Sequence, residues 1–246
     1  MRATFLLLLF FTRLLTAYAQ TKSAPERQQI LDGVGNNNSQ AAVQTFDERY
    51  EGVRGTPFLS DQWAAGTVTL RDGKVHDKVQ LKYDAYQDEL VVKHPYDRAV
   101  IPDKLTITQF VLDSAQTGDS LHFVFVSYLP NNRKFPSNHF AQVLYGSFTD
   151  SQNSTLLATH TRKLIKADYE GAYSADRRYD AFGPIMTSYY LIKPNGQTER
   201  FKPTQRAVRR LFKDKKKAID EFMTVEAINP EYPSDLVRLI EYYDQL

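Results

Sequence analysis

Ten short segments rich in β-branched and aromatic residues follow one another between Phe46 and Phe201, and this run limits the possible folds more than any other feature. Turn sequences such as "RDGK", "LPNN" and "KPNGQ" lie between them. Strands joined by tight turns are typical of an antiparallel meander, because parallel strands need long crossovers. We therefore predict an antiparallel β domain over residues 46–202, folded as a meander, roll or sandwich. The segments are "GTVTL", "KVQLKY", "ELVVK", "RAVI", "LTITQFVL", "LHFVFVSYL", "AQVLYGSF", "TLLATHTRKLI", "TSYYLIK" and "TERF".

The hydrophobic period changes after residue 202. Apolar residues then recur at helical spacing in three groups, which predicts three short amphipathic helices over residues 203–246. Thr204, Asp214 and Ser234 are the expected N-caps. Helices this short are marginal alone, so each must bury its apolar face on the sheet or on its neighbours. The expected class is α+β, with a predominantly antiparallel β body and a helical C-terminal segment.

The first residues have the features of a secretory signal. Arg2 precedes an apolar stretch, and Ala17-Tyr18-Ala19 has small residues at the two positions required for cleavage. The stretch is shorter than the roughly 20 residues of a spanning helix, so we expect a signal peptide over residues 1–19, with an uncleaved anchor as the alternative. Residues 20–45 are rich in Gln, Asn and Ser and are expected to form a flexible leader. The chain has no Cys, which excludes a lipidated Cys and disulfides. We expect a secreted or periplasmic protein.

Net charge does not support a general attraction to nucleic acid or to acidic lipid, so any electrostatic binding must be local. The chain has 31 basic and 29 acidic residues, and loss of Arg2 and Arg13 with the signal leaves 29 of each. The charges of the tail are nevertheless segregated. Residues 202–217 hold eight Lys and Arg against Asp214, whereas residues 218–246 hold seven acids against Arg238. The preferred explanation is that basic and acidic helices neutralise each other. The alternative is a basic face for anionic lipid, glycan or a protein, with membrane contact at most peripheral.

Two groups of residues are candidates for a binding surface. The segment "KADYEGAYSADRRYDAF" places tyrosines among Asp and Arg, is too polar for a strand interior, and is expected to be a long connection. The other group lies in the basic part of the tail. Together the candidates are Tyr169, Tyr173, Arg177, Arg178, Tyr179, Arg209, Arg210 and Lys213.

The stretch "LRDGKVHDKVQLKYDAYQDELVV", residues 70–92, carries several acids and raises the possibility of a metal or acid–base site. Its spacing does not match a calcium loop, and Asp72-Gly73 is a strong hairpin signal. We therefore interpret its acids as turn residues and as the wet side of a sheet, with a second connection between Asp84 and Asp88.

Other catalytic and metal motifs are not recognisable. No pair of histidines has the i, i+4 spacing of a helical zinc site, and "YGSFT" lacks the second Gly of a nucleophile elbow. No catalytic residue, metal or cofactor is predicted. Among the five histidines, the two that border predicted strands, His94 and His122, are the first to examine; the others are His76, His139 and His160.

Several stretches resemble a group of uncharacterised secreted proteins of Gram-negative bacteria. They are "VRGTPFLSDQW", "GTVTLRDGKVHDKVQLKYDAYQDEL", "KADYEGAYS", "DKKKAIDEF" and "DLVRLIEYYDQL", and the resemblance extends from Tyr50 to the C-terminus. It implies an envelope or extracellular location and no particular activity. Our leading hypothesis is a non-catalytic binding or structural module of the cell envelope that binds an envelope protein, a glycan or itself. The alternative is a hydrolase that acts on an envelope polymer or glycan through acidic residues.

Overall fold

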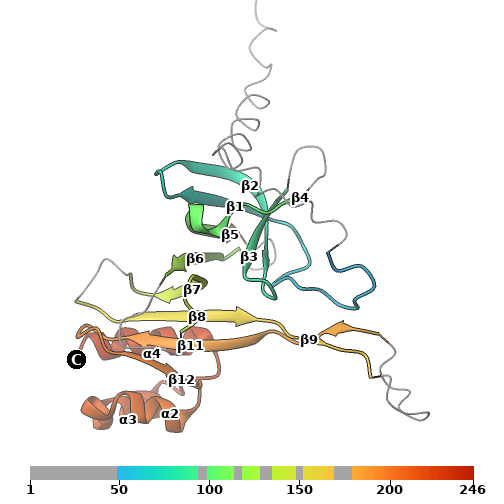
Figure 1. Cartoon of the computed structure of the whole chain (residues 1–246). Helices are drawn as coiled ribbons and strands as arrows, with labels where there is room; N and C mark the ends of the chain where they lie inside the picture. Colours follow the sequence, from blue (N-terminus) through green and yellow to red (C-terminus); the bar gives the residue numbers. More distant parts are fainter. Residues whose placement is uncertain (1–48, 94–98, 114–117, 128–134, 148–151, 169–178) are drawn as a thin grey trace, which may run out of the picture. The chain divides into compact units, whose positions relative to one another are not determined.

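A computed structural model describes residues 49–93, 99–113, 118–127, 135–147, 152–168 and 179–246, all within one compact unit of residues 40–246. The predicted signal and leader, residues 1–45, lie outside the described part. The fold is α+β, as predicted: a ten-stranded antiparallel sheet is followed by three C-terminal α-helices (Figure 1). No helix in the described part is long and apolar enough to cross a membrane.

Two meanders make up the sheet, whose strand order is β12-β11-β8-β7-β6-β5-β1-β2-β3-β4. One meander runs from β1 to β4, the other runs from β5 through β8 to β11 and β12, and the pairing of β1 with β5 joins them. A small separate pair, β9 and β10, lies in the connection from β8 to β11. The strands are β1 (Ala64–Leu70), β2 (Val75–Asp84), β3 (Glu89–Lys93), β4 (Ala99–Val100), β5 (Ile107–Asp113), β6 (Ser120–Val126), β7 (His139–Tyr145), β8 (Thr155–Thr161), β9 (Leu164–Ile165), β10 (Ala181–Phe182), β11 (Met186–Ile192) and β12 (Thr198–Phe201).

The hairpin between β1 and β2 confirms the turn predicted at Asp72-Gly73. Gly73 has a φ of 84°, which a side chain disfavours, and its N–H donates to the carbonyl of Leu70 at 3.0 Å. The Asp72 carboxylate accepts from the backbone N–H of Lys74 at 3.1 Å. This acid therefore has the turn role that its sequence context indicates.

Two of the predicted strands are shorter than expected. Residues 105–106 belong to a short 3₁₀ helix, η1 (Lys104–Thr106), because the Asp103 side chain accepts from the Leu105 N–H at 2.9 Å and caps the turn. The predicted segment over residues 155–165 divides at Thr161, after which β9 leaves the main sheet to pair with β10.

An aromatic cluster fills the core between the two meanders. Phe110 stacks on Phe123 with ring centroids 4.7 Å apart, Tyr83 contacts both rings, and Phe140 packs edge-on against Phe110. All four side chains are fully buried. Strand β6, in which apolar residues follow one another almost without a break, lies between β5 and β7. Only Phe123 and Val126 of this strand are buried, however, so it is covered less completely on its second face than its continuous apolar sequence predicts.

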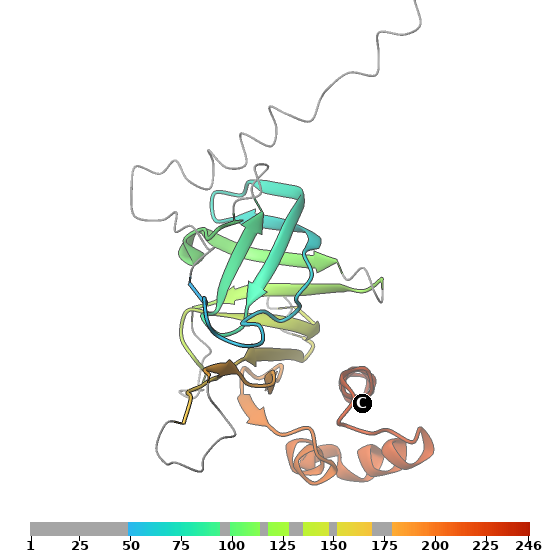
Figure 2. The ribbon, with the colours of Figure 1, turned by 90° about the vertical axis from the view of Figure 1, so that its right-hand side faces the viewer.

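The helices pack beside β8, β11 and β12 and share one core with them (Figures 1 and 2). They are α2 (Gln205–Leu211), α3 (Lys216–Val225) and α4 (Pro233–Asp244), with a 3₁₀ turn η2 (Lys213–Lys215) between the first two. The sheet contributes buried residues such as Leu156 and Leu191, and the helices contribute Leu211, Ile219 and Leu239. The boundary near residue 203 thus separates two kinds of secondary structure but not two cores.

One of the three predicted helix caps is confirmed. Thr204 accepts from the Ala207 N–H at 3.3 Å and begins α2. The other two predictions are wrong. Asp214 lies inside η2, where its carboxylate instead accepts from the Tyr243 hydroxyl at 2.8 Å, and α4 begins one residue before Ser234, because Pro233 fits the first helical position.

Candidate functional site

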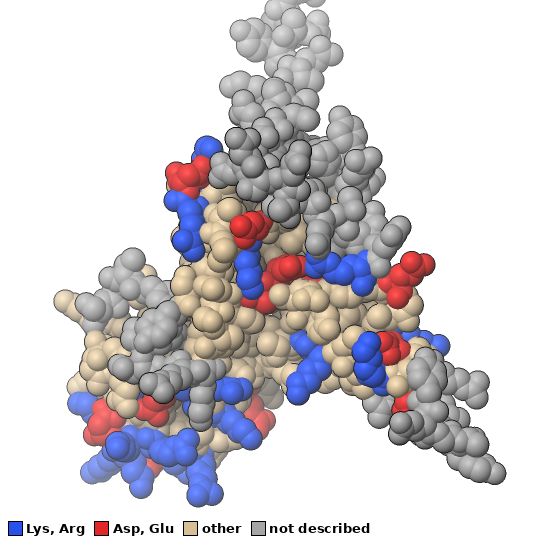
Figure 3. Space-filling view, viewed as in Figure 1, with Lys and Arg blue, Asp and Glu red and all other residues tan. Residues whose placement is uncertain are grey.

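A basic surface covers the outer side of the first helical turns of the tail. We define it by eight residues, all exposed, which lie at the end of β12, along α2, in η2 and at the start of α3. The opposite side of α2 carries Val208 and Leu211, which are buried in the core, so the cations necessarily face outward. Figure 3 shows Lys and Arg gathered over this helical end of the molecule. The members of the basic surface are Lys202, Arg206, Arg209, Arg210, Lys213, Lys215, Lys216 and Lys217.

Neutralisation by the acidic helices, the preferred expectation, is limited to one ion pair. Arg209 contacts Asp220 of α3, with Nε 2.7 Å from the carboxylate oxygen. Lys215 donates to the main-chain oxygen of Leu246 at 3.2 Å. Within the described part of the chain, the basic surface has no other ion pair. Two further acids of the tail, Glu226 and Asp235, pair with Arg238, which does not belong to the basic surface. The result is a local excess of positive charge.

The second predicted surface is only partly described. Tyr169, Tyr173, Arg177 and Arg178 lie outside the described residues. Tyr179 is described, and the guanidinium carbon of Arg54 lies 3.2 Å from its ring centroid. Beside this pair, Lys166 and Asp180 form an ion pair at 2.8 Å on the rim of an open hollow of about 490 Å³.

The structure does not bring Tyr179 together with the basic surface. Tyr179 lies two residues before β10, which pairs with β9 at one end of β8, whereas α2 and α3 lie beside the other end (Figure 1). The sequence-based set of candidates therefore divides into two separate surfaces.

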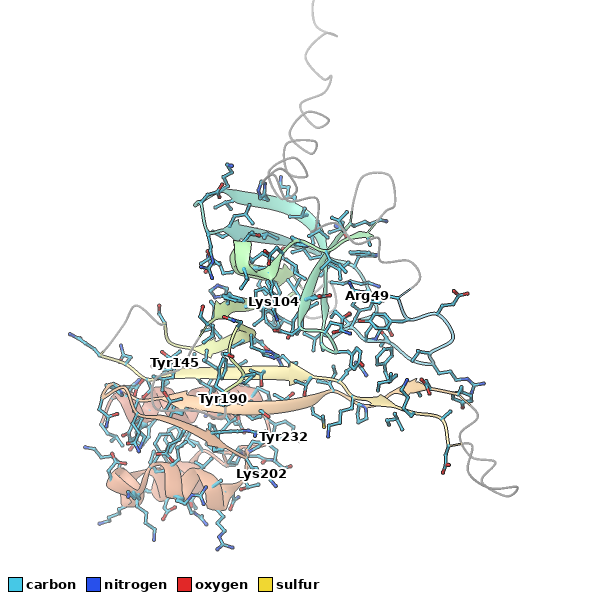
Figure 4. All side chains as sticks on the ribbon, in the orientation of Figure 1. Arg49, Lys104, Tyr145, Tyr190, Lys202 and Tyr232 are labelled. Atoms are coloured by element: carbon cyan, nitrogen blue, oxygen red, sulfur yellow. The ribbon has the colours of Figure 1, made fainter. Side chains whose placement is uncertain are left out.

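A buried polar centre around Asp88 was not expected from the sequence. Its carboxylate accepts from the Tyr83 hydroxyl at 2.9 Å and from the Phe140 N–H at 3.1 Å, and the Lys104 ammonium lies 3.0 Å away. Figure 4 labels Lys104 near the β2–β3 hairpin and, beyond it, Arg49, which contacts Glu89. The sequence predicts Asp88 as an acid at the connection between two strands. It does lie in the turn after β2, but it is only 6% exposed.

His139 completes this centre. Its Nδ1 lies 2.9 Å from the second carboxylate oxygen of Asp88, and its Nε2 is buried without a hydrogen-bond partner. Asp88 has a φ of 58°, in the left-handed region that Asp tolerates better than most residues. No local spacing could have paired residues 88 and 139, because the contact depends on the packing of β7 against the β2–β3 turn.

Asp84 is the second buried acid of the same turn. It is fully buried and accepts from the backbone N–H groups of Tyr86 and Gln87, each at 2.9 Å, and from the Tyr50 hydroxyl at 2.5 Å. Burial raises the pKa of Asp84, while these hydrogen bonds oppose the rise. The connection predicted between Asp84 and Asp88 is confirmed, but its two acids are buried, because the chain from Tyr50 to Leu59 packs over the turn.

The histidines are dispersed over the sheet. His94 lies outside the described residues, and His122 Nε2 is 3.1 Å from the Gln109 side-chain oxygen. His160 contacts Gln142 and Thr187 through its two ring nitrogens, and burial lowers its pKa to about 4. Among the residues that the structure describes, no three His, Asp or Glu side chains are grouped so that they could hold a metal ion.

Comparisons with protein families, with curated proteins and with solved structures found no match to this chain. The functional argument therefore depends on the geometry and on the features of the sequence. The basic surface and the Asp88–His139 centre are the two features that the geometry offers.

Proposed function

We propose that this protein is a non-catalytic secreted or periplasmic module of the bacterial cell envelope, and that it binds an anionic envelope component through the basic surface. The observation that supports this proposal is the set of eight exposed basic side chains with one ion pair in the described structure. Like charges concentrated on one face repel each other, and an anionic partner reduces this repulsion when it binds. The predicted signal over residues 1–19 and the resemblance to secreted proteins support the location.

The proposal is tested by mixing the purified secreted chain with envelope fractions of a Gram-negative bacterium at low and high salt. Binding should occur and weaken with salt, because screening shortens the reach of exposed charges. A triple variant, Arg210→Glu, Lys213→Glu and Lys216→Glu, should lose most of the binding. These three residues have no ion pair in the described part of the chain, so the fold should be kept.

A control reverses three exposed lysines elsewhere, Lys74→Glu, Lys78→Glu and Lys163→Glu, and of these Lys74 forms a surface ion pair with Asp72. It changes the net charge by the same amount but leaves the basic surface intact, and it should bind like the unaltered protein. A chain that stays monomeric and binds no envelope fraction would contradict the proposal. Equal loss in both triple variants would mean that net charge, and not this surface, controls binding.

A second candidate, the hydrolase alternative, is favoured by one observation. The hydrogen bond from His139 Nδ1 to Asp88 resembles the orientation of a general base, and Nε2 has no partner. Against it, Nε2 is buried, and Asp88 is already bound to Tyr83, Lys104 and Phe140. Release of soluble fragments from purified envelope polymer by the unaltered protein, and its loss in a folded His139→Gln variant, would favour this candidate.

A further inference from the structure

We infer that the anionic component bound by the basic surface is the headgroup layer of a phospholipid bilayer. This inference rests on the proposed function, because the same surface does the binding, and it names the partner. Shape, side-chain chemistry and burial of the apolar side of the helices each favour a bilayer over the other anionic partners of an envelope.

The basic surface projects outward, and its residues line neither of the two described hollows. Figure 3 shows its side chains at the outer end of the helical part. A hollow of about 600 Å³ beside the start of α2 is lined by Thr204, Met223 and Glu231 among others, and by none of the eight basic residues. Cations that project from a convex surface contact a flat anionic layer together, whereas an extended polymer chain is held best along a groove.

The side chains provide diffuse charge and little geometric selection. Five of the eight are lysines, which are flexible point charges, and three are arginines. The one aromatic residue between 202 and 217, Phe212, is 1% exposed and packs on Tyr243 with ring centroids 4.4 Å apart. Sugar rings and bases are usually held by exposed aromatic faces, which this surface lacks. Lipid headgroups need only a layer of positive charge.

Burial limits the binding to the headgroup level. The apolar residues of α2 and α3 that would otherwise enter the hydrocarbon, such as Leu211, Ile219 and Met223, are in the core with the sheet. An interfacial helix that inserts must have a free apolar side, and these helices do not have one. Attachment should therefore be peripheral, reversible and controlled by salt.

The experiment measures co-sedimentation of the purified secreted chain with vesicles of phosphatidylcholine, with and without phosphatidylglycerol. Binding should require phosphatidylglycerol. It should weaken steeply as salt rises, since the screening length falls from about 10 Å at 0.1 M to about 3 Å at 1 M. Because each basic residue near an anionic bilayer changes affinity about fivefold, the Arg210→Glu, Lys213→Glu, Lys216→Glu variant should lose about a hundredfold or more. The Lys74→Glu, Lys78→Glu, Lys163→Glu control should bind normally.

A parallel measurement with a soluble anionic polysaccharide separates the two proposals. Binding to the polysaccharide but not to vesicles would overturn the bilayer inference and leave the proposed function standing. Vesicle binding that is equal in the two triple variants would also overturn it. If neither vesicles, polysaccharide nor envelope fractions bind the chain, both proposals fail.

Discussion

Asp88 connects three parts of the sheet through one carboxylate. It holds Tyr83 from β2, Lys104 from η1, and both His139 and the Phe140 N–H from β7. Removal of a buried carboxylate that accepts from several donors strongly lowers the stability of a fold, because each donor is then left unpaired away from water. The stability of the β body should therefore depend strongly on its negative charge.

Asp88→Asn tests this dependence. Asn has nearly the same shape and tolerates the positive φ of 58°, so the backbone should be kept while the charge is removed. We expect the free energy of unfolding, measured by urea denaturation, to fall by about 2 to 4 kcal/mol. Asp72→Asn in the exposed β1–β2 hairpin is the control and should have a much smaller effect, because Asp72 faces water. Equal effects at the two positions would show that burial of Asp88 contributes nothing particular.

His160 should make the fold sensitive to mild acid. Burial lowers its pKa to about 4, from an ordinary value of 6.5. Between these pH values the unfolded chain binds a proton that folded His160 does not, so stability is lost as the pH falls from about 6.5 to 4. The difference amounts to up to about 3 kcal/mol. The melting temperature of the protein should fall over this window more than that of His160→Gln, which cannot titrate. Parallel pH profiles would show that another group causes the loss.

Local patterns predict most elements but not their partners. Alternation and β-branched residues locate β1, β3, β11 and β12 to within a few residues, and the helical period locates the three helices. The pairing of β1 with β5 could not be predicted, because it depends on packing between segments about 40 residues apart. The basic surface follows from the helical period, which places its cations opposite Val208 and Leu211. Whether the acidic helices neutralise this surface depends on how the helices pack against each other. That packing cannot be predicted from the local spacing of residues.

The junction between the two meanders has one position where only glycine fits. At Gly66 of β1 the register with β2 shifts by a bulge, and a Cβ would lie 2.0 Å from the Val111 carbonyl oxygen of β5. Gly66→Ala should therefore force β1 and β5 apart and cost about 3 kcal/mol in chemical denaturation. Gly118→Ala is the control, since its φ of 73° is strained but the space around it is open, and it should cost about 1 kcal/mol. A Gly66→Ala protein as stable as the control would mean that the sheet can adapt there.

The sheet and the helical tail should unfold as one unit, because a single core includes residues of β8, β11, β12 and all three α-helices. The one Trp of the chain, Trp63, packs instead near Phe58 and Val91, so its fluorescence reports the β1–β4 end of the sheet. Circular dichroism at the helical band reports the tail. We expect the two signals to change at the same urea concentration.

Leu239→Ala provides the decisive comparison for this cooperativity. Leu239 is fully buried in α4, so its truncation should cost about 2 to 5 kcal/mol. In a cooperative molecule the cost moves the Trp63 transition as far as the helical one, although no residue of α4 belongs to the cluster around Trp63. If only the helical signal shifts, the tail unfolds by itself, and the basic surface would then be attached to the sheet by a separable element. Coincident shifts would instead mean that the sheet and the tail, which carries the basic surface, unfold together.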